Sequence, residues 1–345
     1  MSDGLSVEAE PGFRPVPGWG LDGPLGGCVE VADVAVDGAD NVYVFARKES
    51  TVFRLSPAGE VQARWDPTPF IRPHAITVSP VDAAVFCVDD FAQAVMKFTP
   101  DGEPVMRIES IADLSFTGYT RGDSGSVRRA GPPFCYPTAV SFGPDGDLFV
   151  SDGYGNARIH RFNAAGKLLD SWGEPGHEHG QFVLPHAVLV DGERLYVADR
   201  ENDRVQVFDL DGRFLNEWTD CYRPAKLCRD AEGMFLLAEL GRVNKAEGPS
   251  RELDLSAHTG RITRRDPSGR ILEELTSTGR PGRETFFAPH GIALDSRGDL
   301  YIAETYVTFF RGQAPAHTPL HKLALGRTPR DPCATRPGTS GAAAR

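Results

Sequence analysis

The sequence lacks the features of a membrane protein and those of a disulfide-stabilised protein. No apolar stretch approaches the roughly 18 residues that a membrane-spanning helix needs. Residues 1–20 contain acidic side chains and prolines but no apolar core, unlike a signal peptide. The six cysteines are scattered and form no Cys-x-x-Cys pair, as expected for free thiols in a reducing compartment. The sequence therefore predicts a cytoplasmic protein without a membrane partner.

Positive charge is outnumbered, with 37 Lys and Arg residues against 48 Asp and Glu residues. The formal net charge is −11 at pH 7 and the sequence pI is about 5.3. Local basic stretches such as Arg128-Arg129 and Arg264-Arg265 are short and are typical of a solvated surface. An acidic chain of this kind is not expected to bind nucleic acid or an anionic membrane.

Amphipathic helical periodicity is nearly absent, and a repeat of short strands takes its place. A strand that ends in an acidic residue recurs as AAVFCVD (83–89), DLFVSD (147–152), RLYVAD (194–199), GMFLLAE (233–239) and DLYIAE (299–304). A sixth copy, NVYVFA (41–46), lacks the acid. An apolar strand precedes each copy, and a Gly turn follows a further strand. Repeats of roughly 40–45 residues made of strands are typical of propeller blades, whereas a β-sandwich would not repeat one signature six times.

The sequence therefore predicts an all-β fold, a six-bladed β-propeller of the NHL type, as a single domain over residues 1–325. Residues 326–345 are rich in Pro, Thr, Gly and Ala and are predicted to form a disordered tail. Two insertions, at about 108–134 and 242–259, interrupt the repeat. Loops of this length within a domain are usually functional or mobile.

Three histidines occupy one position of the repeat. His74, His186 and His290 each follow a proline at the start of the first strand of units 2, 4 and 6. The corresponding residues of units 3 and 5 are Thr138 and Ala225. Alternate blades of a six-bladed propeller are 120° apart, so three imidazoles at equal depth should converge in the central channel. Three histidine ligands with an open position are typical of a catalytic zinc or another divalent metal.

Polar residues that follow the second strand of a unit should lie at the channel mouth, near this metal. They are Arg47 in unit 1, Tyr154 in unit 3 and Arg200 in unit 4. Guanidinium groups bind carboxylates with two hydrogen bonds, and a tyrosine beside a cation can act as a base. The residues alone also allow a plainer reading, in which Arg200 pairs with Asp199 or Glu201 and Tyr154 is an ordinary loop aromatic.

Two segments carry a resemblance to a known family. VSDGYGNARIHRFNAAGKLLDSWG (150–173) and GQFVLPHAVLVDGERLYVADRENDRVQVF (180–208) are similar to the peptidyl-α-hydroxyglycine α-amidating lyases, which are NHL-type six-bladed propellers. The similarity extends over roughly residues 31–305. It implies that His74, His186 and His290 are zinc ligands, that Tyr154 is the base, and that Arg200 and Arg47 are active-site arginines. It also implies cleavage of an N-acyl α-hydroxyglycine, a carbinolamide, into an amide and glyoxylate.

The sequence departs from the family pattern at several positions. The family has a cysteine where this chain has Gly155, so Cys135 has lost the disulfide partner that the resemblance implies. The resemblance also associates Val34, Ile76 and an aspartate with a structural calcium, but that aspartate is Gly291 here, which makes calcium doubtful. Ala288 replaces a methionine near His290, so the small carboxylate-bearing substrate is expected to differ. A metal-dependent hydrolase of an amide or lactone, and a non-enzymatic NHL-type binding scaffold, remain alternatives.

Overall fold

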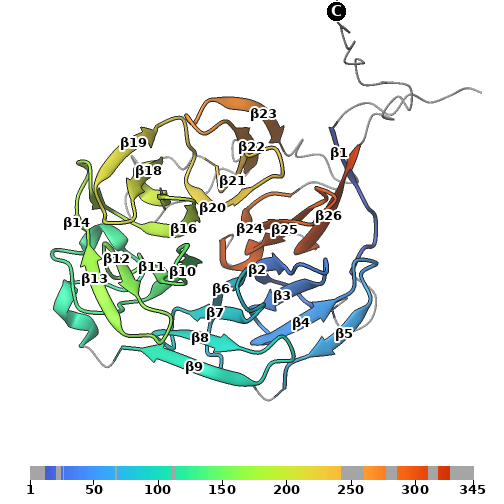
Figure 1. The fold of residues 1–345 in the computed structure, drawn as a ribbon, viewed down its shortest axis with the longest axis horizontal. Helices are drawn as coiled ribbons and strands as arrows, with labels where there is room; N and C mark the ends of the chain where they lie inside the picture. The colour runs from blue at the N-terminus through green and yellow to red at the C-terminus, as the bar shows by residue number, and fades with distance from the viewer. Residues whose placement is uncertain are drawn as a thin grey trace, which may run out of the picture.

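The computed structural model describes residues 12–20, 25, 27–66, 68–110, 113–241, 260–276, 286–309 and 318–326. Six four-stranded antiparallel sheets are arranged in a ring around a common centre (Figure 1), which confirms the six-bladed propeller. The predicted tail beyond residue 326 and the insertion at 242–259 lie outside the described residues. In the described part of the chain, no helix is long and apolar enough to cross a membrane.

The strands of each blade follow one another from the channel outwards. Blade 1 contains β2 (Val31–Val36), β3 (Val42–Ala46), β4 (Thr51–Leu55) and β5 (Val61–Arg64). Blade 2 contains β6 (Pro73–Val78), β7 (Val85–Asp89), β8 (Ala94–Phe98) and β9 (Pro104–Glu109). Blade 3 contains β10 (Pro137–Phe142), β11 (Leu148–Asp152), β12 (Arg158–Phe162) and β13 (Leu168–Trp172). Blade 4 contains β16 (Pro185–Asp191), β17 (Arg194–Asp199), β18 (Arg204–Asp209) and β19 (Phe214–Trp218). Blade 5 contains β20 (Pro224–Arg229), β21 (Phe235–Glu239), β22 (Arg261–Arg265) and β23 (Ile271–Thr276).

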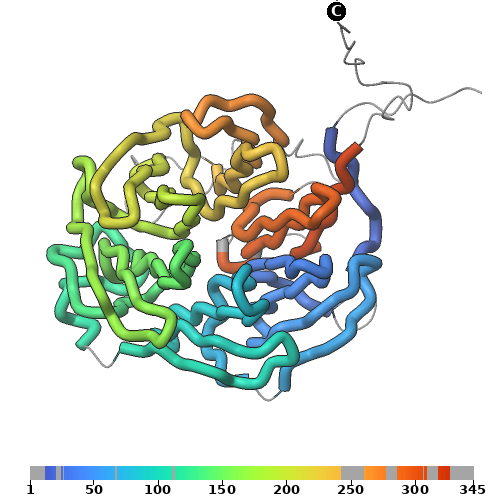
Figure 2. Tube along the Cα trace, in the orientation of Figure 1, coloured from blue at the N-terminus to red at the C-terminus, as the bar shows by residue number. Residues whose placement is uncertain are grey.

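Blade 6 closes the ring with strands from both ends of the chain. It contains β24 (Pro289–Leu294), β25 (Leu300–Glu304) and β26 (Leu320–Gly326), and its outer strand is β1 (Gly12–Pro15). The blue N-terminal strand therefore lies beside the red C-terminal strand (Figure 2), paired from Gly12 with Gly326 to Pro15 with Leu323. Hydrogen bonds between the two ends hold the ring shut, and β1 gives blade 6 the same number of strands as the other blades.

The connections between blades carry little further secondary structure. The short elements are β14 (Glu174–Pro175), β15 (Gln181–Phe182), the 3-10 helices η2 (Leu114–Thr117), η3 (Ser124–Ser126) and η4 (Arg200–Asn202), and α1 (Tyr306–Phe309). The predicted insertion at 108–134 contains the end of β9, η2 and η3, and it is largely ordered by backbone hydrogen bonds.

Adjacent blades interlock through tryptophans and turn glycines. Trp65, Trp172 and Trp218 lie at the outer edges of blades 1, 3 and 4, and each packs on the turn glycine of the following blade. At Gly269, for example, a Cβ would lie 2.1 Å from the Trp218 ring, and the residue has a φ of +94°. Only glycine satisfies both the left-handed backbone and the close approach. The same contact at Gly102 and Gly212 explains why the turns of blades 2 and 4 also carry glycine.

The recurring acid is a structural clamp. Asp89, Asp152, Asp199, Glu239 and Glu304 are fully buried at the ends of the second strands. Each accepts hydrogen bonds from backbone N–H groups just before the innermost strand of its own blade. A buried carboxylate is stable when backbone donors satisfy it in this way. These hydrogen bonds fix the chain segment that leads into the innermost strand of the blade. The three channel histidines lie near the start of such strands.

Candidate active site

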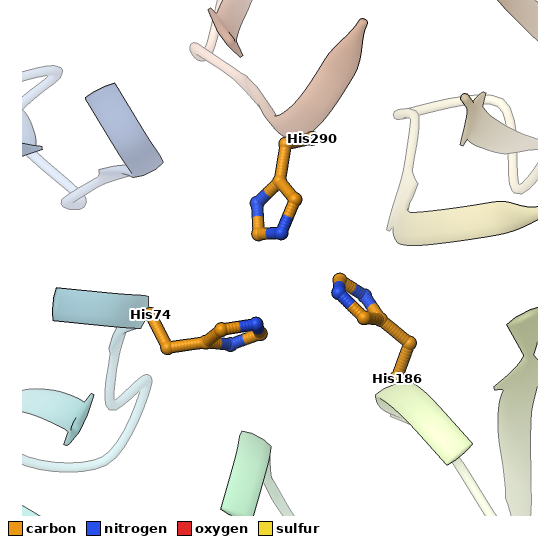
Figure 3. Close-up of side chains that lie close together, drawn as sticks. All are labelled: His74, His186 and His290. Atoms are coloured by element: carbon orange, nitrogen blue, oxygen red, sulfur yellow. The ribbon is translucent and has the colours of Figure 1, made fainter. Parts of the chain in front are cut away.

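The three histidines meet in the channel. His74 is on β6, His186 on β16 and His290 on β24, and their imidazoles point toward one another (Figure 3). Their ligand atoms all lie within 4.8 Å of one another, and the ring centroids are 4.8–5.1 Å apart. In each of these strands, the pairing register with the second strand of the blade shifts at the histidine. The proline before the histidine and the residue after it are paired, and the histidine between them is skipped. The histidine therefore has no cross-strand partner, and this irregularity turns its side chain into the channel.

Each imidazole is held by the next blade. The Nδ1 atoms of His74, His186 and His290 lie 2.6, 2.8 and 2.7 Å from the carbonyl oxygens of Thr138, Ala225 and Ala32. Thr138 and Ala225 occupy the position that the histidines occupy in their own blades, and Ala32 is its counterpart in blade 1. A carbonyl oxygen only accepts, so each Nδ1 carries the proton and each Nε2 keeps its lone pair. Such bonds fix the tautomer and orientation of metal-ligating histidines.

The electrostatics keep the three rings neutral. Burial lowers the pKa of all three imidazoles well below the ordinary value. Neighbouring imidazoles lower the pKa of His74 and His290 further, and nearby arginines lower it for all three. The Nε2 atom of His290 is buried and has no hydrogen-bond partner. An unpartnered buried acceptor facing two more unprotonated nitrogens suits a divalent cation. The donor set therefore fits the predicted metal, with His74, His186 and His290 as the residues that would hold it.

Tyr154 lies directly beside this cluster. Its hydroxyl oxygen is 3.0 Å from Nε2 of His74 and 3.4 Å from Nε2 of His186. Both nitrogens are acceptors, so the phenol donates to one of them. The preceding Gly153 permits this position, because a Cβ there would lie 2.2 Å from the carbonyl oxygen of Pro185. The SDGY motif thus brings blade 3 against the strand that carries His186.

Arg200 supports the phenol from blade 4. Its Nη1 donates to the Tyr154 hydroxyl oxygen at 3.5 Å, and its Nε donates to Glu201 at 3.0 Å. Burial opposes the charge of the guanidinium, but Tyr154 and Glu201 outweigh this effect and raise the pKa of Arg200. The sequence prediction that Tyr154 and Arg200 approach the histidines therefore agrees with the geometry.

Arg47 takes a different place. Its Nε donates to the carbonyl oxygen of Pro73 at 3.1 Å, and its Nη1 lies 3.5 Å from Glu30. The side chain is buried, and burial, followed by the charge of Arg72, lowers its pKa. Arg47 thus anchors the residue before His74, while its role in binding substrate stays a prediction.

A cavity of about 760 Å³ opens beside Tyr154 and Arg200. Phe91, Tyr119 and Tyr136 contribute aromatic rings to its wall, and residues 121–125 of the 108–134 insertion border it. This volume lies within the usual range of roughly 300–1,000 Å³ for small-molecule sites. The insertion therefore helps to form the pocket.

Sequence reasoning missed Arg72, a charged residue of this pocket that directly precedes Pro73 and His74. The other two histidine units have Leu184 and Ala288 at this position. The arginine was therefore visible as an exception within the repeat. The carbonyl acceptors of the imidazoles were not visible, because any residue type provides a carbonyl.

The place that the resemblance associates with calcium is occupied by an ion pair. Lys226 Nζ lies 2.5 Å from Oδ2 of Asp33, and Oδ2 also accepts from the N–H of Ile76. A Cβ at Gly291 would lie 2.2 Å from Oδ1 of Asp33, so a larger residue does not fit there. These residues do not fit a calcium ion, because the ammonium group already neutralises the carboxylate.

Comparisons with known proteins agree with the fold. The NHL repeat family matches residues 134–162. A solved structure of a streptogramin B lyase superimposes with a TM-score of 0.55 at 14% identity, over 92% of this chain and 97% of the other. At this identity the likeness shows the fold alone. The chain is thus an NHL-type six-bladed β-propeller with a three-histidine cluster in its channel.

Sequence relatives confirm the resemblance to the amidating lyases. The chain is 32% identical over 281 residues to peptidyl-alpha-hydroxyglycine alpha-amidating lyase 1 of Drosophila melanogaster. The alignment covers 74% of this chain and 47% of the fly protein. It is 28% identical to NHL repeat-containing protein 3 of Mus musculus, over 83% of this chain and 79% of the mouse protein. The chain therefore spans about half the length of the fly lyase.

Proposed function

We propose that this protein is a carbon–nitrogen lyase that cleaves a small, carboxylate-bearing carbinolamide into an amide and glyoxylate. The observation that carries the proposal is the position of the Tyr154 hydroxyl. It lies within hydrogen-bond reach of the unprotonated Nε2 atoms of two imidazoles and of Arg200. The sequence similarity to amidating lyases supports the same reaction. The free cysteines among the described residues support a cytoplasmic location.

The residues of the site would divide the work as follows. A divalent ion such as zinc, bound by the three histidines, supplies a Lewis acid that polarises an oxygen of the substrate. Tyr154, as a phenolate whose negative charge Arg200 stabilises, takes the proton of the substrate hydroxyl group and becomes a neutral phenol. The carbonyl of glyoxylate forms as the C–N bond breaks. The departing nitrogen takes up one proton, which Tyr154 can return, so the reaction consumes neither water nor an oxidant.

The cavity also serves this reaction. Its aromatic wall can cover the acyl group of the substrate and exclude water from the reacting carbon. Exclusion of water favours bond cleavage over hydrolysis of the same amide.

Product analysis tests the proposal. The purified, metal-loaded protein is incubated with N-benzoyl-α-hydroxyglycine, and benzamide, benzoate and glyoxylate are quantified by mass spectrometry against a protein-free control. Equal amounts of benzamide and glyoxylate above the control are expected. Release of benzoate instead would favour the hydrolase alternative. A protein that purifies without stoichiometric metal, and that forms none of these products after metal is added, would favour a binding scaffold.

A further inference from the structure

Arg72 presents free hydrogen-bond donors to the cavity. Its side chain is 24% exposed, and Nη1 lies 2.5 Å from Oδ2 of the fully buried Asp90. Within the described residues no other side-chain N–H of Arg72 has a protein acceptor. Asp90 thus holds the guanidinium at one corner and leaves the edge formed by Nε and Nη2 open.

The position of Arg72 places it at the reacting end of the cavity. Its guanidinium carbon is 5.8 Å from the ring centroid of Tyr154, and that of Arg200 is 5.4 Å away. Arg72 also packs on Phe91, at 4.7 Å from the ring centroid. The stacking and the ion pair together fix the side chain, so little conformational entropy is lost when it binds a ligand.

Arg47 and Arg200, the two arginines predicted from the sequence, offer fewer free donors. Arg47 is buried and does not line the cavity. Arg200 already donates through Nε to Glu201 and through Nη1 to Tyr154. Of Arg47, Arg72 and Arg200, Arg72 therefore has the most accessible pair of parallel N–H groups, and such a pair matches the two oxygens of a carboxylate.

We propose that Arg72 binds the carboxylate of the substrate through its Nε and Nη2 edge. The inference rests on the proposed function, which requires a carboxylate on the carbon that carries the hydroxyl group. It adds a residue to which neither the repeat nor the family resemblance gives a role.

The experiment uses ligands that the proposed reaction cannot cleave, because they lack the hydroxyl group. N-benzoylglycine carries the carboxylate, and N-benzoylglycinamide replaces it by a neutral amide. Binding of each is measured by isothermal titration calorimetry to metal-loaded wild-type protein, to Arg72→Gln and to Arg161→Gln. Arg161 is a matched control outside the cavity: it is 26% exposed, pairs with Asp147 at 2.8 Å and packs on Phe149.

We expect Arg72→Gln to bind N-benzoylglycine about 10- to 100-fold more weakly, since hydrogen bonds to a charged group are lost. Its affinity for N-benzoylglycinamide, and the behaviour of Arg161→Gln with both ligands, should match the wild type. Equal affinity of wild type and Arg72→Gln for N-benzoylglycine overturns the inference, as does an absence of binding to the wild type. Binding as expected without glyoxylate release from the hydroxylated substrate would contradict the proposed reaction alone.

Discussion

The ammonium group of Lys226 and the carboxylate of Asp33 lie 2.5 Å apart across the channel, although 193 residues separate them in the sequence. Lys226 is on β20 of blade 5 and Asp33 is on β2 of blade 1. Asp33 also accepts from the N–H of Ile76 on β6, and it follows Ala32, the carbonyl partner of His290. One buried carboxylate thus joins three blades and lies next to the support of a histidine.

Replacing Lys226 by methionine should destabilise the protein. The substitution keeps the length of the side chain but leaves the Asp33 carboxylate buried without its counter-charge. Removal of one partner of a buried ion pair costs roughly 3–5 kcal/mol. Urea denaturation of the wild type and of Lys226→Met, with an unchanged m value, measures this loss.

The matched comparison is the double variant Lys226→Met/Asp33→Asn. The side-chain oxygen of an asparagine still accepts hydrogen bonds from backbone N–H groups but needs no counter-charge, so this variant should recover part of the stability.

Calcium should leave the thermal stability of the wild type unchanged, because Lys226 neutralises Asp33. A calcium-dependent rise in the wild-type melting temperature would contradict this account of the channel.

Substitution of a channel histidine should reduce metal binding. The wild type is expected to hold close to one zinc or similar divalent ion per chain, because three neutral imidazoles offer their Nε2 atoms to one point. His186→Ala should lower metal affinity on the order of tenfold or more. His177→Ala is the control, since this histidine is exposed. Metal content is measured after dialysis by mass spectrometry, and equal content in both variants would exclude the site.

The blade repeat and the positions of the histidines could be predicted from the sequence. Both are visible because the same residue types recur at the same position of successive repeat units. The recurrent acid was visible, but its role as a clamp on backbone N–H groups was not, since the clamp is a tertiary contact. Strand β1 of blade 6 was also not predicted. It lies outside the repeat, and only closure of the ring gives Gly12–Pro15 a partner. Lys226 was hidden for the same reason: its partner lies across the channel.

Cys135 should be a free thiol in the wild type. The described cysteines are all free, and burial, with Asp152 nearby, raises the pKa of Cys135 to about 12. A Cβ at position 155 would lie 2.5 Å from its Sγ, so Gly155→Cys should form a disulfide with it under oxidising conditions. Closure of this loop should stabilise the protein on the order of 3 kcal/mol relative to the reduced variant.

Thiol titration of the denatured, unreduced protein measures both states. Oxidised Gly155→Cys should melt at a higher temperature than its reduced form, whereas reductant should not affect the wild type. Gly155→Ser is the control, because it introduces a similar Cβ without a second thiol. A disulfide at Cys135 in the wild-type protein would show that the prediction is wrong.

Replacing Tyr154 by phenylalanine should strongly reduce turnover while metal and fold are retained. The phenol is the group of the site that lies within reach of His74, His186 and Arg200 together, and phenylalanine removes only its oxygen. Loss of a general base typically lowers the rate on the order of 10²–10⁴-fold. Arg200→Lys should also be slow, because an ammonium group cannot donate to Tyr154 and Glu201 with the fixed geometry of a guanidinium.

The measurement is kcat for glyoxylate release, with metal content and melting temperature determined for each variant. Tyr196→Phe is the control, since this buried tyrosine packs between Trp218 and Phe235 on the blade 4 and blade 5 interface. If Tyr154→Phe retains near-native kcat, the phenol is not the base, and a hydrolase that uses activated water becomes the better description of the site.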